Sequence, residues 1–146
     1  MIKFDFSSVR KQAIDFRQIG MILKKAEKSL GSSRSIYMDD PESAFTLAYE
    51  SMLKASMALM FSQGYRPRVQ LGHHKTMIKF SKYVLGESYA GMTDTYDHMR
   101  GKRNRVVYDV GAVSEAEVKE ALSMARKYLN VIKQKIEEDN PQMKLL

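Results

Sequence analysis

The segment from Asp39 to Gly64 constrains the fold more than any other part of the chain. It opens with Asp39-Asp40-Pro41-Glu42, where an aspartate can cap a helix, proline suits the first helical position and an acid follows in the first turn. From there to about Gln63 and Gly64, apolar residues occupy nearly every side of the predicted helix. We therefore expect the central helix of a bundle, or a helix that is central on one side and faces a subunit interface on the other.

The N-terminal third of the chain predicts a long amphipathic helix. Apolar residues recur at steps of three and four from Val9 to Leu30. Ser7 or Ser8 is a suitable N-terminal cap, and Gly31 with the serines after it is a suitable end. No segment alternates at period two for long enough to predict a strand.

Three further helices are expected in the second half of the chain. Shorter helices should span about 72–85, ended by Gly86, and about 90–107. Ser114 and Glu117 have the spacing of a capping box in front of a fifth helix, which should end before Asn140-Pro141. Gly64-Tyr65-Arg66-Pro67 should form a turn.

These patterns predict an all-α fold, an antiparallel up-and-down helical bundle of four to five helices. No repeat or linker divides the 146 residues, and that length is enough to bury a sizeable core. We expect a single domain over 1–146, with a core of about 9–136 and a basic C-terminal tail of about 139–146.

The charge and residue usage narrow the classes of partner and compartment. The formal net charge of +7 favours anionic partners such as nucleic acid, nucleotides or an acidic protein. The absence of cysteine excludes disulfides, thiolate metal sites and cysteine nucleophiles, and suits a reducing compartment. No long apolar run or signal-peptide segment stands out, so we expect a cytoplasmic protein with no membrane association.

The histidines give no conventional catalytic or metal motif. His73 and His74 are adjacent, and neighbouring helical side chains point in different directions, so capping or surface roles are expected. His98 lies away from the apolar side of its helix and should be solvated. Phosphate-binding glycine loops, nucleophile triads and di-iron carboxylate motifs are absent from the sequence, and we expect neither a metal nor a cofactor.

The stretch RGKRNRVVYD, residues 100–109, places a cation where a core residue is expected. On a helix, Arg103 falls within the same arc of roughly 100° as Met92, Tyr96, Met99, Val106 and Val107. A guanidinium on an apolar face needs an anion, because an unpaired buried charge costs several kcal/mol. Either Arg103 pairs with an internal acid such as Glu50, or it lines a cleft or subunit interface and binds a phosphate. Arg100, Asn104 and Tyr108 form the adjoining strip.

Three segments resemble a HEPN domain: AFTLAYESMLKASMALMFSQGYRP, the loop GHHKTMIKF, and RNRVVYD leading into SEAEVKEALSMARKYLNVIK. The resemblance covers about residues 9–136, and its motif-like part is the arginine–asparagine pair. HEPN domains are small helical bundles, commonly dimeric. Many are metal-independent RNases or partners of minimal nucleotidyltransferases in toxin–antitoxin modules.

The resemblance also implies site residues. The family signature is an arginine, often followed by asparagine, and then a histidine four to six residues beyond. Here it implies Arg103, Asn104 and Tyr108 as candidate catalytic residues, with Tyr108 standing where the histidine would be. A tyrosine with a pKa near ~10 is a poor general base at neutral pH, so phosphate binding survives this replacement better than catalysis does.

The leading hypothesis is a homodimeric HEPN-like domain with a basic cleft at its dimer interface. The cleft would bind RNA, a nucleotide, or a nucleotidyltransferase or antitoxin partner, with phosphate contacts from Arg100, Lys102, Arg103 and Arg105. One alternative is an active metal-independent RNase toxin that uses Arg103 with Tyr108 or His98. A second alternative is a non-catalytic structural or interaction protein.

Overall fold

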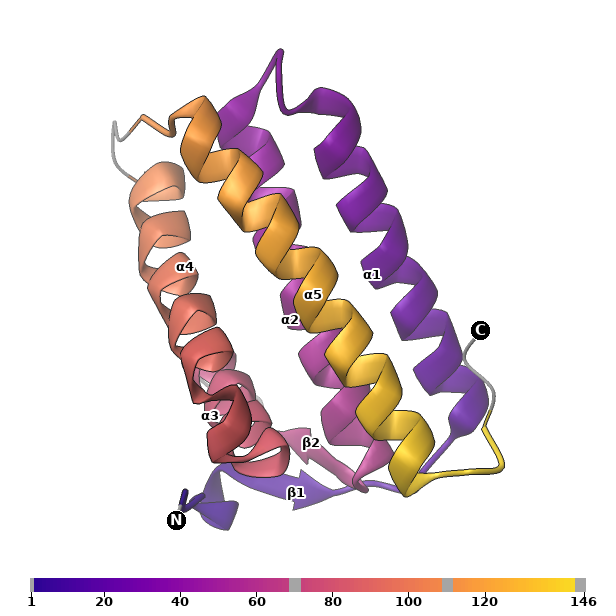
Figure 1. Ribbon diagram of the computed structural model, residues 1–146. Coiled ribbons are helices and arrows are strands. Elements are labelled where there is room, and N and C mark those ends of the chain that lie inside the picture. Colours follow the sequence, from indigo (N-terminus) through magenta and orange to yellow (C-terminus); the bar gives the residue numbers. More distant parts are fainter. Residues whose placement is uncertain (1, 69–71, 109–111, 144–146) are drawn as a thin grey trace.

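The computed structural model describes residues 2–68, 72–108 and 112–143. Over these ranges the chain forms five α-helices and one small antiparallel sheet (Figure 1). The helices are α1 (Phe16–Ile36), α2 (Pro41–Ser62), α3 (His73–Leu85), α4 (Ala90–Tyr108) and α5 (Glu115–Asp139), and the strands are β1 (Val9–Lys11) and β2 (Tyr65–Pro67). The predicted helical class is therefore confirmed, with a small sheet that was not predicted.

The central helix is α2, as its sequence predicts. It contacts α1, α3, α4, α5 and β2, and successive long helices run in opposite directions (Figure 1). The carboxylate of Asp40 accepts a bond from the Ser43 amide at 3.1 Å, and Pro41 takes the first helical position. The alanines 44, 48, 55 and 58 are fully buried. Their small size allows the neighbouring helices to approach closely.

The first helix begins and ends later than the sequence predicts. Asp15, and not Ser7 or Ser8, caps α1, since its carboxylate accepts from the amides of Arg17 and Gln18 at 3.0 and 3.3 Å. Gly31 does not end the helix, which continues to Ile36. A glycine inside a helix costs only about 1 kcal/mol relative to alanine, and the burial of Ser33 against α2 continues the packing beyond it.

The expectation that the chain has no strand is wrong. β1 pairs with β2 in the antiparallel register Val9↔Pro67, Arg10↔Arg66 and Lys11↔Tyr65. The turn between α2 and β2 contains Gly64, whose φ is 84°. Thus Tyr65 to Pro67, predicted as turn, is strand. Val9 is buried with Met60, Met77 and Phe80 in a second cluster of core residues beside the main one. Val9 is therefore a core residue, as its apolar spacing predicts, but it lies in a strand and not in the first helix.

The C-terminal helix follows its prediction. Ser114 and Glu117 form the full capping box, with both bonds at 3.1 Å, and α5 ends at Asp139. Asn140 is buried and Met143 packs against the core, so part of the expected tail belongs to the folded domain. Residues 144–146 of that tail lie outside the described residues.

Candidate functional site

The basic stretch of α4 is divided between two sides of the helix. Arg100 and Arg103 face α2 and α3, where their charges act on Tyr49 and His74. Lys102 and Arg105 face α5, together with His98. Side chains that are adjacent in sequence therefore cannot act on a single ligand from a single direction.

On the first side, five residues from three helices form what we call the arginine–histidine cluster: Tyr49 of α2, His74 of α3, and Asp97, Arg100 and Arg103 of α4. The Tyr49 hydroxyl lies 3.2 Å from His74 Nδ1. Arg100 Nε donates to Asp97 Oδ1 at 3.1 Å. Tyr49 is fully buried, whereas His74, Arg100 and Arg103 are half-buried, so the cluster lies at the edge of the core.

The electrostatics of the cluster keep its histidine neutral. Burial, together with the smaller effects of the charges of His73, Arg103 and Arg100, lowers the pKa of His74 to about 4. Burial raises the pKa of Tyr49 to about 12, although the charges of Arg100 and Arg103 oppose that rise. At neutral pH the cluster thus combines an uncharged imidazole with two guanidinium cations, of which Arg100 is paired with Asp97 and Arg103 forms no ion pair with any described residue.

Most hydrogen-bond donors of the Arg103 guanidinium lack an acceptor among the described residues. Its Nε is buried and has no hydrogen-bond partner, and its Nη1 makes one long bond of 3.4 Å to Asn104 Oδ1. Within the described part of the chain Arg103 forms no ion pair, and Glu50 instead lines a separate hollow with Val106 and Val107. The internal ion pair considered from the sequence is therefore not formed, and the guanidinium is left able to bind an external anion.

A hydrogen-bonded network of buried hydroxyl groups joins α4 to α2 and α5. The centre of the Tyr96 ring lies 5.8 Å from that of Tyr49 and 5.0 Å from that of Tyr128, with the ring planes tilted by 55° in both pairs. Ser56 Oγ forms hydrogen bonds with the hydroxyls of Tyr96 and Tyr128 at 3.1 and 2.6 Å. Arg100 and Arg103 follow Tyr96 by four and seven residues, so they lie on the same side of the helix. The predicted apolar arc is accordingly buried at Tyr96 and Met99, but it ends before Val107, which is 46% exposed.

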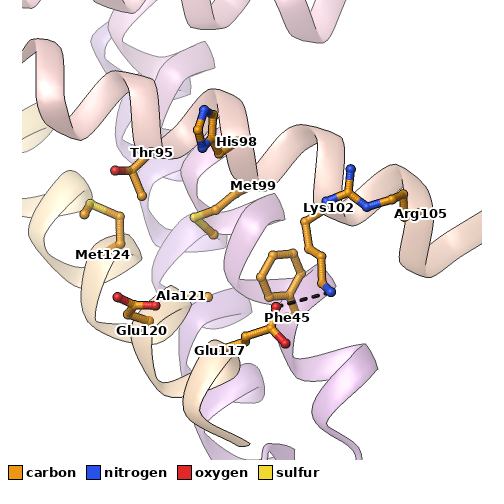
Figure 2. Close-up of a pocket in the computed structure, with 10 residues that line it drawn as sticks. All are labelled: Phe45, Thr95, His98, Met99, Lys102, Arg105, Glu117, Glu120, Ala121 and Met124. Carbon is orange, nitrogen blue, oxygen red and sulfur yellow. Dashed lines mark ion pairs between the residues drawn. The ribbon is translucent and has the colours of Figure 1, made fainter. Parts of the chain in front are cut away.

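On the second side, a hollow of about 350 Å³ lies between α4 and α5 (Figure 2). Phe45 of α2 and Met99 of α4 form its apolar floor. Lys102 reaches across to Glu117 of α5 at 3.2 Å and also donates to the Ala112 carbonyl at 3.2 Å. Because the Lys102 ammonium is already paired, it is less available for a phosphate than Arg103, which forms no ion pair with any described residue.

The remaining predicted residues lie at the surface. Asn104 and Arg105 are exposed, and Tyr108 is 78% exposed at the last residue of α4. Over the described ranges Tyr108 has no hydrogen bond or ring contact. His73 and His98 are exposed, as expected. Asp109, the last residue of the RGKRNRVVYD stretch, lies outside the described residues.

The sequence analysis missed His74 and Tyr49 as members of the site. His74 precedes Met77 and Ile78, both buried, by three and four residues. That spacing indicates that His74 lies on the apolar side of α3, and it could have separated His74 from the exposed His73. Nothing in the sequence places His74 near Arg103, because their proximity depends on how α3 packs beside α4.

Comparisons with known proteins do not identify a family. No family model matches the chain, and no curated protein matches its sequence. Across the described residues no three histidine or acidic side chains group closely enough to hold a metal ion. No helix in the same ranges is both long and apolar enough to cross a bilayer.

Proposed function

We propose that this domain binds the phosphate of RNA or of a nucleotide at the arginine–histidine cluster. The observation that carries the proposal is Arg103, whose buried Nε lacks an acceptor while its guanidinium lies beside Arg100 and the neutral His74. Guanidinium groups bind phosphate oxygens through two parallel, charge-assisted hydrogen bonds. A phosphate would supply the missing acceptor and offset the two positive charges.

The resemblance to HEPN domains supports the same proposal and extends it. In this extended form the domain is a homodimer with the basic site at its interface, and a nucleotidyltransferase or antitoxin of a toxin–antitoxin module is its protein partner. The net charge of +7 supports an anionic ligand independently of the resemblance.

Fluorescence anisotropy with a labelled oligoribonucleotide at fixed salt tests the proposal. Arg103→Ala should weaken binding about tenfold or more, because a hydrogen bond to a charged group contributes about 1.5–3 kcal/mol. Lys127→Ala is the matched control, since Lys127 is an exposed cation on α5. Equal affinities for the wild type and Arg103→Ala would reject the site and favour a structural or interaction protein.

A second candidate function, metal-independent RNA cleavage, is favoured by the position of His74. The imidazole of His74, whose pKa the negative charge of a bound phosphate would raise from its low value, can accept the proton of a ribose 2′-hydroxyl while the 2′-oxygen attacks the adjacent phosphorus. The bond from phosphorus to the 5′-oxygen then breaks, that oxygen takes up a proton from water, and the products are a 2′,3′-cyclic phosphate and a 5′-hydroxyl end. Arg100 and Arg103 would stabilise the negative charge that develops on the phosphate oxygens.

Cleavage of labelled RNA in the presence of a chelator tests this second function. We expect His74→Ala and Arg103→Ala to remove cleavage, and Tyr108→Phe to leave it unchanged, because Tyr108 is exposed at the end of α4. Loss of cleavage in Tyr108→Phe but not in His74→Ala would instead assign the reaction to the motif residues. A wild-type protein that binds RNA without cleaving it would leave binding as the function.

A further inference from the structure

The contact between Tyr49 and His74 determines which nitrogen of the imidazole carries its proton. A neutral histidine is protonated on Nδ1 or on Nε2, and the hydrogen bond made by one nitrogen fixes the state of the other. Here Nδ1 lies 3.2 Å from the Tyr49 hydroxyl, and by geometry alone either group could donate. The surroundings of Tyr49 distinguish the two arrangements.

The Tyr49 hydroxyl is the donor of this bond. Its side chain is fully buried, and within the described residues Nδ1 of His74 is its one hydrogen-bond partner. If Nδ1 donated instead, the phenolic proton would lie in the core without an acceptor, which is costly. Burial raises the pKa of Tyr49 to about 12, so the hydroxyl keeps its proton at neutral pH. Nδ1 is therefore the acceptor, and the proton of the neutral imidazole lies on Nε2.

The Nε2–H group of His74 is open to a ligand. The two nitrogens of an imidazole point to different sides of the ring, so Nε2 points away from the buried Tyr49 hydroxyl. Over the described ranges Nε2 makes no hydrogen bond, yet it is not one of the buried unpartnered atoms, so it retains access to solvent. The charges of Arg100 and Arg103 act on the same ring. An anion held by Arg103 would therefore find a second donor at Nε2.

We infer that Tyr49 is a positioning residue that holds His74 as a neutral Nε2–H donor to the phosphate bound by Arg103, an inference that rests on the proposed function. The phosphate then receives hydrogen bonds from a charged and from a neutral donor. Because the imidazole donates in its neutral form, binding requires no protonation of His74. With its proton on Nε2, the imidazole cannot accept the proton of a 2′-hydroxyl at that atom, so this tautomer favours binding over cleavage.

Nitrogen-15 NMR of the imidazole groups in the wild-type protein at neutral pH tests the tautomer directly. The chain has three histidines, and the signals that vanish in His74→Gln belong to His74. The couplings of each nitrogen to the ring hydrogens distinguish Nδ1 from Nε2. We expect a protonated Nε2 and an unprotonated Nδ1. The opposite pattern would overturn the inference, whatever the effect of His74 on RNA binding.

Tyr49→Phe provides a readout that a merely structural role of Tyr49 would not move. A donor to Nδ1 stabilises the neutral imidazole, so its removal should raise the pKa of His74, whereas removal of an acceptor would lower it. The variant leaves the other groups that act on this pair in place: His73 of α3, and Asp97, Arg100 and Arg103 of α4. NMR titration of the ring measures the shift, with circular dichroism as the check on folding. A lowered or unchanged pKa in the folded variant would contradict the inference.

Fluorescence anisotropy with a labelled oligoribonucleotide at fixed salt tests the donor role in binding. His74→Ala should weaken affinity about fivefold, as expected for the loss of one hydrogen bond, and His98→Ala, at an exposed position outside the cluster, should not. His74→Gln should retain more affinity than His74→Ala, because its amide keeps an N–H donor. If Arg103→Ala weakens binding but His74→Ala does not, the donor role is wrong and the phosphate site stands. If Arg103→Ala has no effect, the proposed function itself is wrong.

Discussion

The hydroxyl of Tyr49 lies 3.2 Å from Nδ1 of His74, and this contact joins the central helix α2 to the first turn of α3. Tyr49 is fully buried, so it fixes the imidazole from beneath. The other side of His74 is influenced by Arg100 and Arg103 of α4. Each of the three helices thus contributes a group with a different chemical property: a hydroxyl, an imidazole and the guanidinium pair.

The position of His74 predicts a pH dependence of stability. Its pKa of about 4 in the folded protein lies below the ordinary value of 6.5, so the unfolded state binds more protons between these values. The contribution to stability is complete above about pH 6.5 and is lost as the pH falls toward 4. Urea unfolding of His74→Gln should show a weaker dependence on pH between 4.5 and 6.5 than the wild type. A control variant, His98→Gln, replaces an exposed histidine outside the cluster and should keep the wild-type slope, and equal slopes for all three proteins would contradict the prediction.

The division of the basic stretch predicts unequal effects of its cations on RNA binding. Arg103→Ala should weaken affinity more than Lys102→Ala or Arg100→Ala does, because the Lys102 ammonium is already paired with Glu117 and the Ala112 carbonyl, and the Arg100 guanidinium is already paired with Asp97. Titrations of the single variants at one salt concentration measure this order. A loss in Lys102→Ala that equals the loss in Arg103→Ala would instead point to the hollow between α4 and α5 as the ligand site.

The fold was more predictable from the sequence than the candidate site. Local signals such as the Asp40 cap, Gly86 and the capping box at Ser114 act within a few residues, and each lies where it was predicted. The three-residue strands were missed because alternation over three positions carries no usable signal. Val9 and Ala13 fit the helical spacing of the residues after them, so the helix was predicted to begin near Ser7 or Ser8 and not at the cap Asp15. The grouping of His74 with Arg103 depends on packing between helices, which no local pattern encodes.

The hydroxyl network in the core predicts a measurable cost for one deleted oxygen. Tyr128→Phe removes the partner that lies 2.6 Å from Ser56 Oγ, in a region without solvent access. We expect the free energy of unfolding to fall by about 1–3 kcal/mol, the cost of a lost and unreplaced buried hydrogen bond. Urea denaturation measures it, with Tyr108→Phe as the exposed control. A Tyr128→Phe protein as stable as the wild type would show that Ser56 and Tyr96 satisfy each other alone.

The capping box predicts the contribution of one side chain to α5. Ser114→Ala removes the oxygen that accepts from the Glu117 amide at 3.1 Å, so it should destabilise the protein by about 1 kcal/mol. Ser123→Ala, at an exposed position within the same helix, should be neutral or slightly stabilising because alanine is the better helix former. Thermal unfolding of the two variants side by side distinguishes the cap from a general effect of serine replacement.

The contacting rings of Tyr49, Tyr96 and Tyr128 also give the molecule a built-in optical signal. The sequence contains eight tyrosines and no tryptophan, and these three are fully buried in contact from α2 through α4 to α5. Rigid, asymmetric surroundings give buried tyrosine rings a near-ultraviolet circular dichroism signal. A ligand that shifts α4 relative to its neighbours would therefore change the protein's own spectrum, with no label attached.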